Sequence, residues 1–386
     1  MMLQYTFSLP TTIRFGVGVV KEAGACAKSL GATKVMLVAD QGVIRAGLTR
    51  DVETSLRNAD VPYIYYDKIV PNPRDYHCVE GYETAKAAGI DCLVAVGGGS
   101  SMDTAKAIGT LLTHGGCVQD WCGADKLLRP ITPLIAIPTT AGTGSEVTPF
   151  AVVTDSETHV KLNIFDVKAA PKIALVDPAM LMGLPPHIMA ATGIDAMTHA
   201  VEAYTCKLAV PHTDAYALYA IQLISKNLRS AVNNRSLEAC TGMMLGSTIA
   251  GIAFGYSDVA AVHCMAEALG GRYDLPHGVA NAILLPTVTE YNLPANTKKY
   301  ADVARAMGLD VTGKSDEEAA KTCVEGLRQL CADVGIQPMR EHPEIRPEDF
   351  HALSVAAMAN VSTPSNPRKM TVEAFEELFK KAYAGA

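Results

Sequence analysis

The first half of the chain alternates short apolar runs with amphipathic stretches. Four runs, each with about five to seven apolar residues, end in an acid, a glycine or a hydroxyl; they cover 34–40, 91–100, 133–140 and 172–177. Almost uninterrupted apolar runs of this length predict parallel strands buried on both faces of a sheet. The stretches between them, such as 76–89 and 101–113, have helical spacing. The pattern therefore predicts an α/β domain with ligand groups at the carboxyl ends of its strands.

The pattern changes near Leu184, beyond which no segment is typical of a strand. Several of the later segments are rich in Ala, Met and Leu, and such helices, apolar around most of their circumference, pack inside a helical domain. We therefore expect a domain over 1–184 and an all-helical domain over 185–386, a division that the chain length also favours. The segments with helical spacing are 187–205, 212–232, 237–254, 258–269, 279–291, 294–307, 316–334, 347–358 and 372–384.

Composition excludes several classes of protein. Hydrophobic residues make up 49% and charged residues 19% of the 386 residues, which argues against disorder. The formal net charge of -7 offers no basic surface for nucleic acid, and no apolar run is long enough to predict a membrane span. The ten Cys include no CxxC pair, and the N-terminus lacks the features of a signal peptide. These features favour reduced thiols and a cytoplasmic protein.

Two polar loops are candidates for a nucleotide site. The segment 97–103 (GGGSSMD) follows a clear strand and opens a clear helix, which Ser100 or Ser101 could cap. Its glycines let the backbone come close to a phosphate that faces the helix N-terminus. The segment 139–146 (TTAGTGSE) also follows a strand and is dense in hydroxyls. Either loop alone could be a plain capped turn, but two at the ends of two strands favour a shared site.

The acid at the end of the first buried strand, Asp40, is a candidate for binding an adenosine ribose. A carboxylate at this place would repel a 2′-phosphate and so favours NAD over NADP. The Gly16-Val17-Gly18 turn lies upstream of Asp40 and imitates a dinucleotide fingerprint, but its third glycine position is Lys21 and no strong apolar strand precedes it. We therefore favour a plain turn that opens a helix at 16–18.

Metal-binding residue types gather in the helical half. Asp195 and His199 have i, i+4 spacing, which places them on one helical face, and His263 and Glu267 repeat that spacing. His277 lies at a probable helix start. Each His alone is more often a core residue, but several imidazoles and carboxylates in charge-poor helices favour a divalent metal site. The donor set suits Fe²⁺, Zn²⁺, Mn²⁺ or Co²⁺.

These segments together resemble the iron-dependent (group III) alcohol dehydrogenase family over nearly the whole chain. The matching stretches are GGGSSMDTAKAIG at 97–109, PTTAGTGSEVT at 138–148, GIDAMTHAVEAY at 193–204 and GGRYDLPHGVANAILLP at 270–286, with the Asn72-Pro73 pair. The resemblance implies a Rossmann-like N-terminal domain, a helical C-terminal domain of the dehydroquinate synthase-like type, and a metal in the cleft between them.

The resemblance also implies roles for individual residues. The metal ligands would be Asp195, His199, His263 and His277. The residues that bind NAD(H) would be Asp40 at the ribose, Gly97, Gly98, Gly99 and Ser100 at the pyrophosphate, Asn72 near the nicotinamide, and Thr139, Thr140, Thr143, Ser145 and Lys161 along the cofactor.

Two positions depart from the family pattern. Where relatives usually carry a second His, this chain has Glu267, which could relay a proton or contact the substrate. After Ala253-Phe254, where relatives tend to carry a polar amide, it has Gly255. Gly255 could enlarge the pocket, and Arg272 could pair with an anionic substrate.

The expected function is reversible hydride transfer between NADH and a small, polar or anionic aldehyde, with Fe²⁺ as the favoured metal. A glycerol dehydrogenase-like polyol or hydroxyacid oxidoreductase is an alternative, although such relatives usually offer fewer imidazole ligands. A dehydroquinate synthase-like lyase is an alternative from another class, and the scarcity of Lys and Arg near the metal motifs weighs against it. A protein that merely retains NAD and metal is a further alternative. Neither the substrate nor the physiological direction follows from the sequence.

The N-terminal stretch 4–15 alternates like an edge strand and could pair across subunits, as the family often does. We therefore expect a homodimer or a higher homo-oligomer, with no nucleic-acid or membrane partner.

Overall fold

The chain forms two compact units, which are described separately. A computed structural model describes residues 4–158 and 160–385. One unit comprises 8–140 and 144–184 and is of the α/β type; the other comprises 185–385, with 141–143 and residues 4–7, and is helical. The predicted fold class, a parallel α/β domain followed by an all-helical domain, is confirmed.

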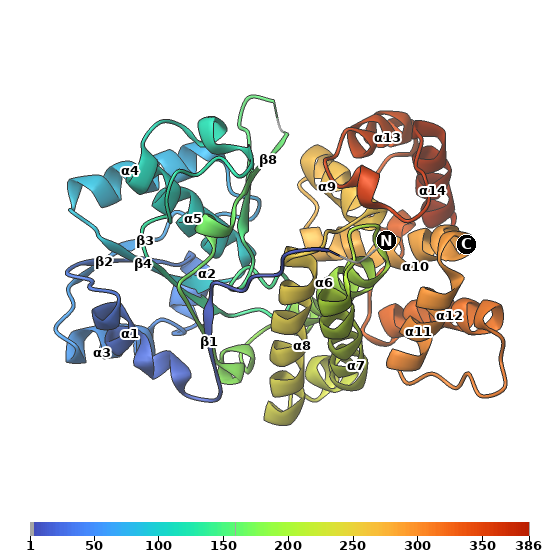
Figure 1. The fold of residues 1–386 in the computed structure, drawn as a ribbon, viewed down its shortest axis with the longest axis horizontal. Helices are drawn as coiled ribbons and strands as arrows, with labels where there is room; N and C mark the ends of the chain where they lie inside the picture. Colours follow the sequence, from blue (N-terminus) through green and yellow to red (C-terminus); the bar gives the residue numbers. More distant parts are fainter. Residues whose placement is uncertain (1–3, 159, 386) are drawn as a thin grey trace. The chain divides into compact units, whose positions relative to one another are not determined.

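The α/β unit is built on a parallel six-stranded sheet with the strand order β1-β9-β6-β4-β2-β3 (Figure 1). Strands β2, β4, β6 and β9 are buried along their whole length, as their apolar runs predict. The sheet consists of β1 (Thr12–Phe15), β2 (Val35–Val38), β3 (Tyr63–Tyr66), β4 (Cys92–Gly97), β6 (Leu134–Pro138) and β9 (Ile173–Val176).

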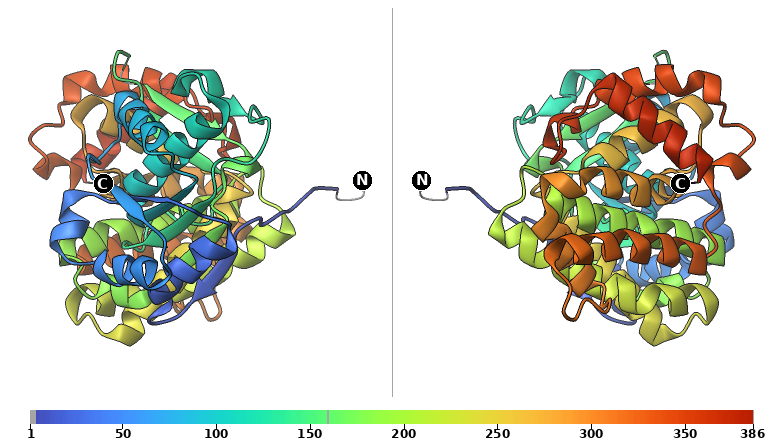
Figure 2. Two further views of the ribbon diagram at one scale, coloured as in Figure 1. Left: turned by 90° about the vertical axis from the view of Figure 1, so that its left-hand side faces the viewer. Right: turned by 90° about the vertical axis from the view of Figure 1, so that its right-hand side faces the viewer.

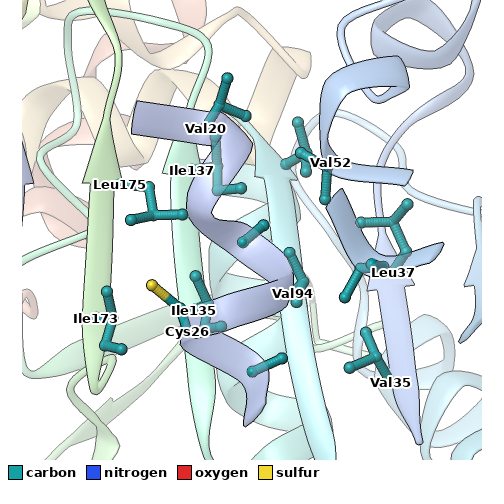
Figure 3. Packing of buried hydrophobic residues seen from close by; sticks show 14 of the residues in the cluster. Val20, Cys26, Val35, Leu37, Val52, Val94, Ile135, Ile137, Ile173 and Leu175 are labelled. Atoms are coloured by element: carbon teal, nitrogen blue, oxygen red, sulfur yellow. The ribbon is translucent and has the colours of Figure 1, made fainter. Parts of the chain in front are cut away.

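Helices cover both faces of this sheet, because alternate residues of each buried strand point to opposite sides. One face packs against α1 (Ala23–Ser29) and α3 (Arg50–Asn58), and Figure 3 shows Cys26 and Val52 lying against the side chains of this face. The other face packs against α4 (Asp75–Ala87) and α5 (Gly99–His114). The short helix α2 (Gln41–Arg45) follows β2 directly.

A smaller second sheet in this unit was not predicted from the sequence. It has the order β5-β8-β7, in which β7 and β8 are antiparallel. Its strands are β5 (Gly123–Ala124), β7 (Phe150–Thr154) and β8 (Lys161–Phe165). Short 3-10 helices of the unit are η1 (Val19–Glu22), η2 (Val118–Trp121), η3 (Val167–Ala169) and η4 (Pro178–Leu181).

The helical unit is organised around α6, whose residues are buried around almost the whole circumference. Helix α6 packs against α7, α8 and α10, and α9 packs against α10 and α13. Figure 2 shows the later helices, in orange and red, side by side. The helices are α6 (Pro186–Thr205), α7 (Pro211–Asn233), α8 (Leu237–Gly255), α9 (Ala261–Tyr273), α10 (His277–Asn292), α11 (Thr297–Ala306), α12 (Asp316–Asp333), α13 (Phe350–Met358) and α14 (Val372–Ala384), and short 3-10 helices are η5 (Leu293–Ala295), η6 (Met339–Glu341), η7 (Pro347–Asp349) and η8 (Thr363–Ser365).

Helix α8 is long and apolar enough to cross a membrane by length and composition, with a mean hydropathy of 1.3. However, 67% of its apolar window is buried inside the protein. Its neighbours α6 and α7 provide that burial. Helix α8 is therefore a core helix of the helical unit.

The N-terminal stretch forms a strand over only part of its length. Thr12–Phe15 is the edge strand β1, and it pairs with β9 of the same chain. Farther toward the N-terminus, the Phe7 ring stacks on His212 and Tyr216 of the helical unit, at centroid distances of 5.4 and 5.8 Å. The described part of 4–15 therefore contacts its own chain.

Candidate metal centre and nucleotide-binding edge

Three helices bring one carboxylate and three imidazoles together inside the helical unit. Asp195 and His199 lie one turn apart on α6, His263 lies in the first turn of α9, and His277 is the first residue of α10. Each offers one ligand atom, and the four atoms all lie within 4.8 Å of one another. These are the four residues that the family resemblance implied as metal ligands.

The spacing of these atoms fits a shared ion better than direct hydrogen bonds. Asp195 carboxylate oxygens lie 3.9 Å from His199 Nδ1, 4.0 Å from His263 Nε2 and 3.6 Å from His277 Nε2. Such separations are too long for hydrogen bonds. Tetrahedral ligands that are each roughly 2.1 Å from one ion lie about 3.4 Å apart.

The protonation states also suit a metal. Burial lowers the pKa of His199 and of His263 to about 3, so both rings are neutral and carry a free lone pair at neutral pH. Among the described residues, His199 Nδ1 and His263 Nε2 are buried atoms without a hydrogen-bond partner. Burial alone would raise the pKa of Asp195, but the three imidazoles and Asn281 hold it below its ordinary value, so it is an anion. A divalent cation would satisfy all of these groups.

A buried carboxylate that the sequence analysis did not single out, Glu202, orients one of the imidazoles. Its Oε2 lies 2.6 Å from His263 Nδ1 and also accepts the Ala260 N–H, while Oε1 accepts the Val262 N–H. Burial raises the pKa of Glu202 to about 7, against the effect of these hydrogen bonds. A proton on His263 Nδ1 that is shared with Glu202 leaves Nε2 as the lone-pair atom toward Asp195.

Two further side chains support the centre from its flanks. Asn281, one turn after His277 on α10, donates to Asp195 Oδ1 over 2.7 Å. The Phe254 ring stacks on the His199 ring, at a centroid distance of 4.0 Å and an interplanar angle of 14°. Both fix the orientation of a candidate ligand. The signal that could have identified Glu202 and Asn281 is their spacing, since each lies one turn from a candidate ligand on a largely apolar helix.

Glu267 lies one turn after His263 on α9 and is partly buried. Its Oε2 accepts a hydrogen bond of 2.7 Å from Asn360 Nδ2. Arg272, which we considered as a partner for an anionic substrate, instead forms an ion pair of 2.8 Å with Asp349. That arginine is therefore already neutralised, and the expectation of an anion-binding role for it lacks support in the structure.

In the α/β unit, Asp40 lies at the carboxyl end of β2, next to the end of β4. It is the N-cap of α2, where its Oδ1 accepts the N–H groups of Gly42 and Val43. Its other oxygen, Oδ2, lies 3.8 Å from the place that a Cβ at Gly97 would take. The structure thus brings Asp40 and the glycine loop together.

The glycine loop lies beside the hydroxyl loop that follows β6. The Thr139 N–H donates to the Gly97 carbonyl, and a Cβ at Gly98 would lie 3.3 Å from Thr140 Oγ1. Helix α5 begins at Gly99 with Gly98 as its N-cap, so our expectation that Ser100 or Ser101 caps it is wrong. Among the described residues, Ser101 Oγ is a buried atom that lacks a hydrogen-bond partner. The backbone of the glycine loop can therefore come close to a bound phosphate, and the Ser101 hydroxyl can donate a hydrogen bond to it.

In the upstream glycine turn at 16–18, two of the N–H donors already have a carboxylate partner. Gly18 is the N-cap of η1, and the N–H groups of Gly18 and Val20 both point to Asp177 Oδ2, at 2.8 and 3.5 Å. The Asp177 carboxylate thus takes the place that a phosphate would occupy. The turn opens a helix, as we favoured.

The remaining candidate cofactor residues fall into separate groups. Lys161 Nζ donates to Asn72 Oδ1 over 3.1 Å and to Thr154 Oγ1 over 3.0 Å, so Asn72 and Lys161 meet at the second sheet. Thr143 belongs to the segment 141–143, which is part of the helical unit. Ser145 lies in a buried network that the sequence analysis missed.

That network joins α5 to the loop after β6. Lys106 is fully buried, and its Nζ donates to Ser145 Oγ over 2.8 Å and to the Phe150 carbonyl over 2.7 Å. Ser145 Oγ donates to Asp103 Oδ1 over 2.7 Å, and the Val152 N–H donates to Asp103 Oδ2. Burial lowers the pKa of Lys106 to about 8 and raises that of Asp103, while each charge favours the ionised form of the other. The pair fixes the position of Ser145.

Comparison with known proteins agrees with this geometry. The family model described as "Iron-containing alcohol dehydrogenase" matches residues 10–178. The model described as "Fe-containing alcohol dehydrogenase family, C-terminal" matches residues 189–383. The chain is 40% identical to a 1,3-propanediol dehydrogenase of Citrobacter freundii, over 98% of this chain and 99% of that protein. It is also 40% identical to a choline dehydrogenase of Bacillus subtilis, over 98% and 95% of the two chains.

A solved structure of 1,3-propanediol oxidoreductase superposes on the chain with a TM-score of 0.96 at 39% identity, covering 98% of this chain and all of that one. The chain belongs to the iron-containing alcohol dehydrogenase family. This iron-containing alcohol dehydrogenase is thus an oxidoreductase that uses NAD(H) and a divalent metal, as the resemblance implied.

The contacts of Glu202 generate a prediction about metal affinity. The Glu202→Gln variant removes the carboxylate charge and replaces one of its two acceptor oxygens with an N–H donor, so the group that fixes the His263 tautomer is disrupted. Loss of such a partner typically weakens metal binding by about 10–100-fold. Competition with a chelator measures the affinity, and Glu238→Gln, an exposed position on α8, is the matched control. An unchanged affinity in a folded Glu202→Gln protein would refute the orienting role.

The buried Lys106–Asp103 pair generates a prediction about stability. Lys106→Met leaves the Asp103 charge buried without its cation, so we expect the free energy of unfolding to fall by about 3–5 kcal/mol. The double variant Asp103→Asn with Lys106→Met should lose less than the sum of the two single changes. Denaturant unfolding of all four proteins gives the coupling energy, and strict additivity would contradict an interaction between the two charges.

Proposed function

We propose that the chain catalyses reversible hydride transfer between NAD(H) and a small alcohol or aldehyde, at a divalent ion bound by Asp195, His199, His263 and His277. The convergence of these four ligand atoms within 4.8 Å carries the proposal. Fe²⁺ is the ion that we propose, although Zn²⁺, Mn²⁺ and Co²⁺ suit the same donor set.

The chemistry divides between the cofactors and the protein. When bound, the ion acts as a Lewis acid on a carbonyl oxygen, while the nicotinamide supplies or takes up the hydride. The protein holds both in fixed positions. Asp195 contributes the anionic ligand, and Glu202 and Asn281 hold His263 and Asp195 in their orientations. Because these supports are buried hydrogen bonds, they cost no reorganisation during the reaction.

The edge of the sheet is the place we propose for NAD(H). Asp40 Oδ2 would accept the ribose hydroxyls, since Oδ1 is already used by the cap of α2. The loop of Gly97, Gly98, Gly99 and Ser100 would bind the pyrophosphate. Asn72 would lie toward the nicotinamide, and the residues that would line the rest of the cofactor are Thr139, Thr140, Thr143, Ser145 and Lys161.

Glu267 is the residue that we propose to contact the substrate or to relay the alcohol proton. It is partly buried and lies one turn from His263, and Asn360 holds its carboxylate. A carboxylate in this position can accept a proton and pass it to solvent.

The alternative functions fit the site less well. A glycerol dehydrogenase-like polyol or hydroxyacid oxidoreductase would share the cofactors, but such relatives usually offer fewer imidazoles than the three present here. A dehydroquinate synthase-like lyase needs cations for a phosphorylated, carboxylated substrate, and Arg272 is already paired with Asp349. A protein that only retains NAD and metal would need no contact with a substrate, and it would therefore give no role to Glu267, the residue that we propose for this contact.

We further propose a cytoplasmic homo-oligomer. All ten Cys are free, and eight of them are buried, which fits a reducing compartment. The edge strand β1 has a neighbour on only one side, so its free edge is available to another subunit.

NADH oxidation by the metal-loaded protein with a panel of about a dozen small aldehydes tests the proposed reaction. We expect turnover with at least one aldehyde and its loss after chelation. Asp195→Ala should lose metal and turnover together, because the three remaining imidazoles provide no anionic ligand. Metal content is measured on the same samples, and Asp310→Ala, an exposed position, is the control. Stoichiometric metal in Asp195→Ala, or no turnover with any aldehyde, would overturn the proposal.

A further inference from the structure

The charge of Glu267 has no cationic partner among the described residues. Its carboxylate accepts a hydrogen bond from the neutral amide of Asn360, and the described ion pairs of the protein do not include it. Most other carboxylates near the centre are neutralised or fully hydrogen-bonded. Glu202 accepts two backbone N–H groups and the His263 ring, and Asp258 accepts the hydroxyls of Ser362 and Ser365.

The field of Glu267 reaches the candidate metal centre. Glu267 lies four residues after His263, which is about 6 Å along α9. Burial is the main cause of the low pKa of His263, and the Glu267 charge acts in the opposite direction, so the two groups interact electrostatically. His277, whose side chain is 36% exposed, forms the most accessible part of the centre, and the partly buried Glu267 is also reached by solvent. A molecule bound at the centre would therefore lie in the field of an uncompensated negative charge.

The nearest candidate for an opposing cation does not offset this charge. Arg272 follows Glu267 on α9, but its guanidinium binds Asp349 over 2.8 Å. Asp349 also accepts from Tyr273 and from Arg346. The Arg272 guanidinium is thus bound by Asp349, and none of the described ion pairs joins it to Glu267.

We propose that Glu267 makes the site select alcohols and aldehydes that carry an ammonium group, and reject those that carry an anion. This rests on the proposed function, in which the reacting oxygen lies at the centre. In a three-carbon amino alcohol the hydroxyl oxygen and the ammonium nitrogen lie roughly 5 Å apart when the chain is extended. That span is comparable with the rise of about 6 Å between His263 and Glu267 along α9, so we expect the two ends of such a molecule to reach the centre and Glu267 together.

The reaction itself is the oxidation already proposed. The carbinol C–H bond breaks and its hydride passes to NAD⁺, the hydroxyl loses a proton, and the C–O bond becomes a carbonyl. The products are NADH, a proton and an aldehyde that still carries the ammonium group. Glu267 changes neither bond; it binds the distant charge.

A purely structural role for Glu267 is the rival explanation, since Asn360 also accepts the Ser362 N–H and so anchors the loop that follows α13. The Glu267→Gln variant separates the two roles. A glutamine carbonyl can still accept from Asn360 Nδ2, so the loop keeps its anchor while the charge is lost.

Three alcohols with the same three-carbon chain provide the test: 3-aminopropan-1-ol, 1,3-propanediol and 3-hydroxypropanoate, which are cationic, neutral and anionic at neutral pH. We measure kcat/KM with NAD⁺ for the metal-loaded protein, and also the Kd of each alcohol by calorimetry without cofactor. The native protein should favour the cation over the anion, and Glu267→Gln should reduce the cation-to-anion ratio by about tenfold or more in both measurements. Glu317→Gln, an exposed position on α12, makes the same change in net charge and should leave the ratio unchanged.

The outcomes separate this inference from the proposed function. One contrary result is that the diol is turned over while the cation-to-anion ratio is the same in Glu267→Gln as in the native protein, and another is that the native protein favours the anion. Either result would show that the proposed charge selection is wrong, and the proposed dehydrogenase reaction would stand. If none of the alcohols is turned over while the Kd values still show the charge preference, the inference stands and the proposed reaction fails. If Glu267→Gln does not fold, the native protein provides the test. High salt screens charges, so it must reduce the cation-to-anion ratio of kcat/KM if that ratio depends on the charge of Glu267.

Discussion

The helical unit depends on one electrostatic constraint, which is that the Asp195 carboxylate is buried and needs positive compensation. An isolated carboxylate in such a place would be protonated or strongly destabilising. Three imidazoles and Asn281 surround it instead, at distances that leave room for an ion. The largely apolar helices α6, α9 and α10 supply the dry surroundings in which such an ion is bound most strongly.

The two candidate sites are stabilised in the same way, by a buried charge in the layer behind the residues that would bind a ligand. In the helical unit Glu202 orients His263, and in the α/β unit Lys106 and Asp103 hold Ser145. Removing one member of such an arrangement leaves another charge or donor unsatisfied, so the supporting residues are as constrained as the ligands themselves. Exposed charged residues are not constrained in this way. Glu267 lies between the two cases, because it is partly buried and, among the described residues, its carboxylate accepts a hydrogen bond only from the neutral amide of Asn360.

The pattern of apolar residues along the sequence was sufficient to predict the main features of the fold. The strands β2, β4, β6 and β9 and most helices of the second half follow the apolar pattern, because burial on both faces leaves an unmistakable run. The second sheet was missed because β7 and β8 are only partly buried, unlike the strands of the main sheet, and they pair with each other in an antiparallel register. The i, i+4 spacing drew attention to the candidate ligands Asp195, His199 and His263, whereas the sequence analysis did not identify Glu202 or Lys106. Their roles depend on contacts with residues 61 and 39 positions away in the chain, which local spacing does not encode. The Arg272 ion pair with Asp349 is of the same kind.

The most direct test of the account is the position of the metal. Crystals of the Fe²⁺-loaded protein, measured on both sides of the iron absorption edge, give an anomalous difference map that locates iron without reference to the protein. The account predicts one peak about 2.0–2.3 Å from one atom each of Asp195, His199, His263 and His277. A fully loaded protein whose peak lies elsewhere, or beyond ligand distance of Asp195, would contradict it.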